Sequence, residues 1–363
     1  EGPALKLAKI PEDSISPGGV RHTTLEVKLP RYLLAEFNTH CVISRNSASS
    51  RARPLPKTLA SIRDEPHMPR WGKAGKGMQD HGELPAPTEH LAKFAVCCRA
   101  CHEQGEDVSS DVLAAMDAAC SAMDAAEQKI AQRLQEAMDS DDFECVAAAL
   151  DSVPLIRRLS RGEQSMIEVL DDLWIEARAA MARSVMIYDF LGVHKQKPNR
   201  LIEPWMWQTI VASATDWANF LNLRCHSATE PDFQRTACAI GEAMLASTPT
   251  PLLFGEWHTP LICDDERGLP WDLKRRLSVA RCARVSYLTH DGKRSHEADE
   301  ALYTRLTSMG HYSPTEHVAR PSQNGEPRGK FYGWTQHRQT LTNQHDHYEP
   351  DPESPAKRYG VLR

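Results

Sequence analysis

The sequence lacks any uninterrupted apolar run of the about 18–20 residues that a membrane-spanning helix needs, so we expect no membrane partner. It also lacks an excess of positive charge, because 49 acidic and 43 basic residues leave a net charge of -6. A protein that binds polynucleotides usually carries a basic surface. We therefore expect no polynucleotide partner, and a bound nucleotide would have to be met by a local cluster of arginines.

Cysteine is sparse: the chain has ten in 363 residues, below the density of a disulfide scaffold. Residues 1–9 contain no apolar signal segment, so we expect a cytoplasmic protein with reduced thiols. Residues 98–102 (CRACH) match the pattern for covalent haem attachment, but that chemistry needs export, and reduced thiols on a helix are the favoured interpretation. No second Cys/His pair stands at zinc-finger spacing, and we interpret residues 345–347 (HDH) as a solvated segment of the tail. We expect no metal.

Hydrophobic periodicity predicts a mixture of strands and helices. Alternation at Leu25, Val27 and Leu29 predicts a strand that stops at Pro30. The final third is predicted to be helical over residues 217–244 and 298–309, and residues 277–287 are compatible with a short strand or a helix.

An Ala-rich block separates the two ends of the chain. Helical spacing of apolar residues over 112–134 and 167–188 predicts two helices with core-packing stripes, the second closed by Gly192. We therefore predict a core of residues 1–88 and 193–363, interrupted at 89–192 by a helical insertion and a connecting helix.

A short segment near the N-terminus concentrates groups that bind phosphate. Residues 40–51 (HCVISRNSASSR) hold four serines, one amide, Arg45 and Arg51, and Arg53 follows. Guanidinium groups, hydroxyls and backbone N–H groups at a turn are the donors that a phosphate group takes. A Ser-rich capped helix with a solvated face explains the same composition equally well.

The spacing within this segment resembles the signature RHRxxSxNxxSxR of the flavin-dependent thymidylate synthases. Five of the seven fixed positions match, whereas Thr39 and Cys41 replace the two arginines that flank the histidine. The matching residues are His40, Ser44, Asn46, Ser49 and Arg51.

Two further segments are similar to the same family. Residues 310–317 (GHYSPTEH) resemble its GHxSPxEH flavin-contact segment and follow an ARVSY run at 283–287. Residues 219–224 (NFLNLR) resemble its Asn-Leu-Arg helix. In most members the GHxSPxEH segment precedes the arginine signature, so this chain has a permuted arrangement.

The resemblance implies an α+β fold with a mainly antiparallel sheet flanked by helices, assembled as a homotetramer with sites at subunit junctions. It implies C5-methylation of a uridine nucleotide, UMP or dUMP, with methylenetetrahydrofolate as one-carbon donor, FAD as reductant and NADPH to re-reduce the flavin. A UMP methylase of the kind found in nucleoside-antibiotic (polyoxin-type) pathways fits as well as a dUMP enzyme.

The resemblance also implies roles for individual residues. Flavin contacts are expected from His40, Val42, Asn222, Arg224, Ser286, His311, Ser313 and Glu316. Nucleotide contacts are expected from Ser47, Ala48, Ser49, Arg51, Gln234 and Arg235, of which Ser49, Arg51 and Arg235 are the candidate catalytic residues. The choice between Gln234 and Arg235 is open, because a shift of one residue turns a helical side chain by about 100°.

Two alternatives remain. Folate-only thymidylate synthases use a Pro-Cys-His nucleophile that this chain lacks, and we interpret Cys41 as a small residue lining the flavin pocket rather than as a nucleophile. The chain could also be a non-catalytic homologue, a flavin- or nucleotide-binding interaction protein. The replaced arginines favour that alternative, and the retained Ser49, Arg51, Ser313 and Glu316 oppose it.

Overall fold

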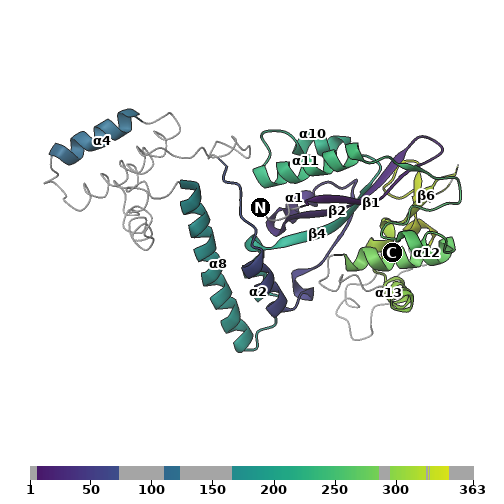
Figure 1. The fold of residues 1–363 in the computed structure, drawn as a ribbon. Helices are drawn as coiled ribbons and strands as arrows, with labels where there is room; N and C mark the ends of the chain where they lie inside the picture. The colour runs from purple at the N-terminus through teal and green to yellow at the C-terminus, as the bar shows by residue number, and fades with distance from the viewer. Residues whose placement is uncertain are drawn as a thin grey trace, which may run out of the picture. The chain divides into compact units, whose positions relative to one another are not determined.

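The computed structural model describes residues 6–72, 110–122, 166–285, 295–323, 326 and 328–342 (Figure 1). The chain divides into two compact units. One comprises residues 1–67 and 185–363 and is called the core unit here; the other comprises residues 68–184 and is called the inserted unit. The segments at 98–102 and 345–347 lie outside the described residues.

The core unit is built on a five-stranded sheet in the order β3-β4-β2-β1-β5. All neighbours are antiparallel except β1 and β5, which are parallel. The expectation of a mixed α+β protein with a mainly antiparallel sheet is therefore confirmed. The strands are β1 (Ala8–Ile15), β2 (Arg21–Pro30), β3 (Ser44–Ser47), β4 (Trp207–Ala214) and β5 (Thr250–Pro251).

The strand predicted from alternation is β2, and it ends at Pro30 as expected. Leu25, Val27 and Leu29 are fully buried, because every second side chain of a strand points to the same face. β2 pairs with β4 along its length, from Thr23 opposite Ala214 to Pro30 opposite Trp207.

Helices α10 (Ala218–Arg224) and α11 (Pro231–Ala246) cover the face of the sheet that bears these residues (Figure 1). The predicted helical region 217–244 is thus two helices. Phe37, Phe220 and Phe233 are almost completely buried between helices and sheet, with ring centroids of Phe37 and Phe220 5.5 Å apart. Burial of such side chains stabilises the fold by roughly 1.5–3 kcal/mol each.

The opposite face of the sheet is covered by α12 (Trp271–Arg284), which packs against α13 (His296–Ser308). Val211 of β4 packs against Cys282 of α12 in a small buried cluster. The region 277–287, predicted as strand or helix, is helical as far as Arg284. The helix predicted at 298–309 is α13, and Gly310 follows it with a positive φ of 71°.

Short elements complete the core unit. Strands β6 and β7 form a two-stranded antiparallel sheet, and Gln336 of β7 donates to Ser44 of β3. The bounds are η1 (Arg31–Leu33), α1 (Leu34–Phe37), η2 (Ser50–Ala52), α2 (Leu55–Asp64), α9 (Pro198–Leu201), η4 (Glu203–Trp205), η5 (Asp264–Glu266), η6 (Ser313–Glu316), β6 (Ala319–Pro321), β7 (Trp334–Gln336) and η7 (His337–Thr340).

The described residues of the inserted unit include α4 (Ser110–Ala122) and most of α8 (Met166–Phe190), which continues into the core unit. Gly192 follows α8 with a positive φ of 74°, as predicted. The expected burial of the whole apolar stripe was wrong: Val185 is buried, but Ile167 and Tyr188 are 38% and 42% exposed. Among the described residues, no helix is both long enough and apolar enough to cross a membrane.

Candidate functional site

The serine- and arginine-rich segment contributes an edge strand rather than a capped helix. Residues 44–47 form β3, which pairs only with β4 in the sheet order, from Ser44 opposite Ser213 to Ser47 opposite Ile210. Because side chains alternate along a strand, Ser44 and Asn46 point to the α12 face and Arg45 to the other. The contacts made by each side chain follow this division.

On the α12 face, β3 meets the GHYSPTEH segment. Ser44 Oγ donates to Glu316 Oε2 at 2.9 Å, and Ser313 Oγ donates to Asn46 Oδ1 at 3.2 Å. Asn46 Nδ2 donates to the Cys282 carbonyl of α12 at 3.0 Å. Two of the three segments that carry the family resemblance therefore touch, although Ser44 and Glu316 are 272 positions apart in the sequence.

Glu316 is the centre of this contact, which we call the Glu316 cluster: Ser44, Glu316, Lys330, Gln336 and Arg338. Its carboxylate also accepts from Lys330 Nζ at 3.0 Å and from Arg338 Nη1 at 2.6 Å. Burial, the largest single influence, would raise the pKa of Glu316. The hydrogen bond and charge of Lys330, with the bonds from Ser44 and Arg338, outweigh burial and hold the pKa below its ordinary value. Glu316 is thus a buried, ionised anchor.

Gln336 links the cluster to the turn before Lys330. Its Nε2 donates to Ser44 Oγ at 3.0 Å and to the Glu316 carbonyl at 2.9 Å, and its Oε1 accepts from the Lys330 backbone N–H at 3.0 Å. Gly329 has a φ of +72°, and a Cβ at this position would collide with Gln336 Oε1. The turn therefore requires glycine for both its backbone conformation and its space.

On the opposite face, the loop before β3 meets the Asn-Leu-Arg helix. Arg224 Nε donates to His40 Nε2 at 3.0 Å, and its guanidinium lies 4.7 Å from the centroid of the Phe233 ring. Burial, and then the charges of Arg224 and Arg45, lower the pKa of His40, so the imidazole is a neutral acceptor. The third segment is thereby joined to the first.

Arg45 and its neighbours shape this loop. Arg45 donates to the Asn38 carbonyl at 2.8 Å and to the Ile43 carbonyl at 3.1 Å, so it supports the backbone. Val42 is 48% exposed. Cys41 is also exposed, and its thiol donates to the Thr39 carbonyl at 3.5 Å.

Four of the predicted nucleotide-binding residues lie at the end of β3 and just after it, from Ser47 to Arg51. Arg31, which the sequence analysis missed, supports this segment. Arg31 Nη1 donates to the Ala48 carbonyl at 3.0 Å and Nη2 to Ser50 Oγ at 3.0 Å. Ala48 is buried, whereas Ser49 is exposed at the start of η2. The backbone of Arg51 lies in η2, and its side chain lies outside the described part of the structure.

The remaining predicted site residues are separate from the Glu316 cluster. Gln234 is half-buried and donates to the Cys225 carbonyl at 3.2 Å, whereas Arg235 is exposed. Asn222 and His311 are exposed as well. Within the described ranges, no hydrogen bond joins any of these four side chains to the cluster. Ser286 lies outside the described residues.

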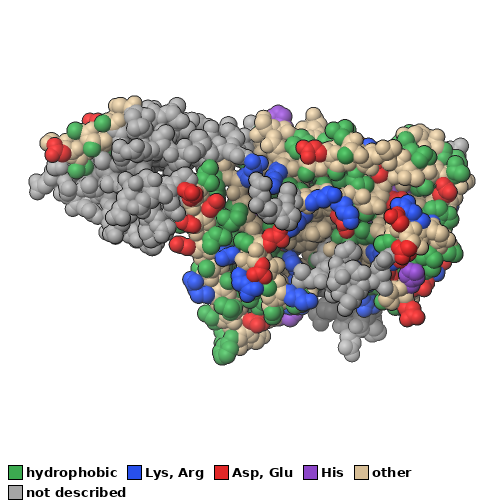
Figure 2. Space-filling view, viewed as in Figure 1, with side chains coloured by type: hydrophobic (Ala, Val, Ile, Leu, Met, Phe, Trp, Pro, Cys, Tyr) green, Lys and Arg blue, Asp and Glu red, His purple; other side chains and the backbone are tan. Residues whose placement is uncertain are grey.

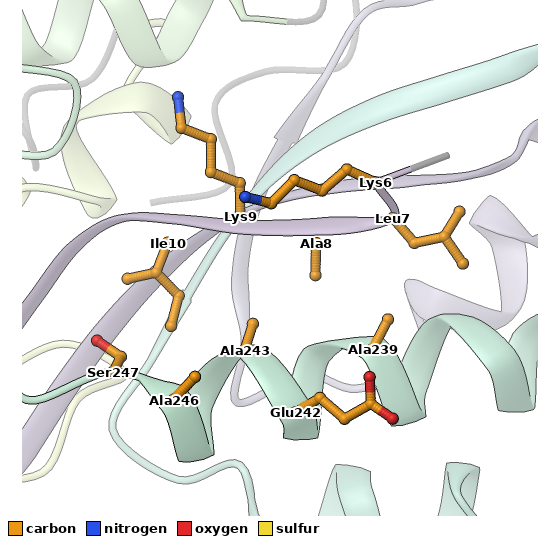
Figure 3. A pocket seen from close by; sticks show the side chains of 10 residues that line it. All are labelled: Lys6, Leu7, Ala8, Lys9, Ile10, Ala239, Glu242, Ala243, Ala246 and Ser247. Atoms are coloured by element: carbon orange, nitrogen blue, oxygen red, sulfur yellow. The ribbon is translucent and has the colours of Figure 1, made fainter. Parts of the chain in front are cut away.

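A groove of about 570 Å³ lies elsewhere, between the start of β1 and α11 (Figure 3). Ala8 and Ile10 point toward α11, where Ala243 faces them, and Lys9 points away. The small alanine side chains leave this hollow. Its lining contains none of the predicted site residues: Lys6, Leu7, Ala8, Lys9, Ile10, Ala239, Glu242, Ala243, Ala246 and Ser247.

Behind Glu316, a chain of buried polar side chains runs through the α12 face of the sheet. Ser213 Oγ bonds to His317 Nδ1 at 2.8 Å and to Thr24 Oγ1 at 2.6 Å. Thr24 Oγ1 continues to His258 Nε2 at 2.8 Å, and His258 Nδ1 to Ser14 Oγ at 2.8 Å. The chain thus crosses from the Glu316 segment to β1.

The two histidines in this row of hydrogen-bonded side chains, His258 and His317, are completely buried. Burial, followed by the nearby His317 charge, lowers the pKa of His258 to about 3. Burial, opposed by Glu316, lowers the pKa of His317 to about 4. Both imidazoles are therefore neutral at pH 7. Hydroxyl groups are the partners of both ring nitrogens of His258 and of Nδ1 of His317.

Lys and Arg side chains lie interspersed with Asp and Glu on the face shown in Figure 2. Comparison with known proteins gave no significant match: no family model, no curated protein and no solved structure matches the chain.

Proposed function

We propose that this protein is a flavin-dependent enzyme that methylates C5 of a uridine nucleotide, UMP or dUMP. One observation carries the proposal: the three segments that resemble the flavin-dependent thymidylate synthases meet around β3. Ser44 contacts Glu316, and His40 contacts Arg224, at 2.9 and 3.0 Å. A chance match of three short motifs gives no reason for segments so far apart in sequence to converge.

The side chains around β3 fit the polar edge of a flavin. The exposed amide of Asn222 and the exposed hydroxyl of Ser313 can donate and accept hydrogen bonds, and His311 is exposed beside Ser313. Arg224 is oriented by His40 and by the Phe233 ring. In the proposal these groups hold FAD, together with Val42 and Ser286, and Glu316 holds the segment that carries Ser313.

The cofactors supply the chemistry that protein side chains lack: FAD would provide the reducing electrons, methylenetetrahydrofolate the carbon unit, and NADPH the renewal of reduced flavin. The chain's own residues bind and polarise. Ser49 and Arg51 would bind the nucleotide phosphate, and Ser47, at the end of β3, and Ala48 would add contacts beside them. A guanidinium, from Arg51 or Arg235, would stabilise negative charge on a uracil carbonyl oxygen and so make C5 more nucleophilic.

We propose a cytoplasmic homotetramer as the working form. Val42 is 48% exposed and Leu223 50% exposed. A flavin site needs apolar walls that exclude water, and a neighbouring subunit could cover these side chains.

The test is flavin binding and turnover by the purified full chain. We expect a yellow protein with a bound-flavin absorbance, and release of tritium from C5-labelled UMP or dUMP when FAD, NADPH and methylenetetrahydrofolate are present. Ser49→Ala should reduce tritium release at least tenfold. Ser308→Ala, an exposed serine on α13, is the matched control and should leave it unchanged.

The outcomes separate the alternatives. Comparison of UMP with dUMP identifies the acceptor. Flavin binding without tritium release from either nucleotide would favour the non-catalytic homologue. A colourless protein that takes up no flavin would overturn the proposal.

A further inference from the structure

The Glu316 cluster contains two cations that the proposed function does not use. Lys330 and Arg338 come from the C-terminal segment, outside all three motif segments. Their side chains are 42% and 38% exposed, whereas the Glu316 side chain is 9% exposed. The carboxylate is therefore covered by the two cations, and the cations present their outer sides to solvent.

The charges of this group do not cancel. One carboxylate faces an ammonium and a guanidinium, which leaves one positive charge in excess. Each cation also keeps donors: Lys330 has three N–H groups and Arg338 has five, and the bonds to Glu316 use one of each. Such a pair can take a second anion without releasing the first.

The two cations are held in place before any ligand binds. Glu316 fixes Lys330 through Oε2 and Arg338 through Oε1, so both nitrogens lie around one carboxylate. Gln336 fixes the Lys330 backbone, and the Tyr312 ring lies 5.6 Å from the Arg338 guanidinium. Preorganised donors lose less entropy on binding than free surface side chains.

We propose that Lys330 and Arg338 form a phosphate-binding subsite beside Ser313. This inference rests on the proposed function for the identity of the ligand: the phosphate would belong to FAD or to the uridine nucleotide. Guanidinium and ammonium groups are the usual cationic partners of phosphate, and charge-assisted bonds are among the stronger ones in proteins. Glu316 acts as a positioning residue for both cations.

The experiment measures the contribution of phosphate to affinity. Dissociation constants for FAD and riboflavin, and for UMP and uridine, are determined with wild-type protein and with Lys330→Met and Arg338→Met. Each variant should weaken binding of one phosphorylated ligand about tenfold or more, and change its unphosphorylated counterpart less than about twofold. The affected pair identifies the phosphate.

Two further variants guard the interpretation. Lys330→Arg keeps the charge and should stay within about threefold of wild type for every ligand, which separates phosphate binding from a folding defect. Arg305→Met removes an exposed cation of α13 and should change none of the four constants. If the FAD-to-riboflavin and UMP-to-uridine ratios of dissociation constants are unchanged in both Met variants, the subsite is overturned.

Failure of the proposed function has a different signature. If wild-type protein binds none of the four ligands, flavin and uridine chemistry are excluded, and inorganic pyrophosphate becomes the probe. Pyrophosphate binding that Lys330→Met abolishes would support the subsite by itself. Absence of pyrophosphate binding to wild-type protein would overturn the subsite too.

Discussion

The two faces of the five-stranded sheet differ in what holds them against their helices. The α11 face is apolar: Leu25, Ile210 and Phe233 are fully buried together. The α12 face buries Thr24 and Ser213, which are joined by hydrogen bonds to buried histidines. Apolar packing is not directional, whereas a series of hydrogen bonds fixes the position and orientation of each side chain in it. The first face therefore gives stability, and the second gives the geometry that places Glu316 beside β3.

The largest effect should come from breaking the apolar face. Phe233→Ala removes a fully buried ring that contacts Phe37 and Phe220, and it should lower the free energy of unfolding by about 3–5 kcal/mol. Urea denaturation measures the change. Leu245→Ala, on the same helix but 88% exposed, should stay within about 0.5 kcal/mol, and a similar loss in both variants would contradict the assignment of the core.

Acid should weaken the polar face. The pKa of His317 is about 4 when folded, below its ordinary value near 6.5, so the unfolded chain binds more protons between these limits. This residue's contribution is complete above pH 6.5 and falls by about 1.4 kcal/mol per pH unit as the pH drops toward 4.

His317→Gln isolates that contribution. Burial raises the pKa of the Glu12 and Glu230 carboxyl groups to about 7, so these groups make the folded protein less stable as the pH rises. The pH dependence of wild-type stability therefore does not isolate His317. The difference between wild type and His317→Gln removes the contributions of these carboxyl groups. Urea denaturation from pH 4.5 to 7.5 should show that the stability of wild type relative to the variant increases with pH up to about 6.5; parallel curves would show that His317 does not titrate differently on unfolding.

Interrupting the buried chain at its middle should have a smaller effect at neutral pH. Thr24→Val keeps the shape but leaves His258 Nε2 and Ser213 Oγ without this hydroxyl, which should cost about 1–3 kcal/mol of stability. The same substitution at exposed Thr304 of α13 is the control and should cost less. Equal losses at the two positions would show that the buried hydrogen bonds of Thr24 add no stability beyond that of an exposed threonine hydroxyl.

The smallest effect concerns the proposed nucleotide contact on α11. Because Arg235 is exposed and Gln234 is tied to Cys225, Arg235→Ala should raise the KM for the uridine nucleotide about tenfold, or about 1.4 kcal/mol. Gln234→Ala should change KM less than about threefold. Steady-state kinetics measures both, and the reverse order would place the contact at Gln234.

Local patterns predicted some elements well. β2 and α13 lie where alternation and helical spacing placed them, because apolar and polar side chains take turns along β2 and recur at helical spacing along α13. β4 was not predicted as a strand. Both faces of β4 are buried: Val211 and Ser213 on one side, Ile210 and Ala212 on the other. A strand of this kind lacks the alternation of apolar and polar residues that marks a half-exposed strand.

The candidate site was predictable only where a motif marked it. Residues 44–47 were recognised by their spacing, but their strand conformation was not, because polar residues in an edge strand give no hydrophobic signal. Arg31, Lys330 and Arg338 were missed, since each acts through contacts with residues distant in sequence, such as Lys330 with Glu316. Nothing in the local composition separates them from ordinary surface cations.

Gly329 makes an exposed position behave like a buried one. A single methyl group there would push aside the Gln336 amide, which joins the last strand to a residue 292 positions earlier in the chain. Solvent exposure would rank this site among the most permissive in the molecule. A saturation library should instead tolerate few substitutions at Gly329. Each replacement would disturb the hydrogen bond between Gln336 and Ser44, a residue near the N-terminus.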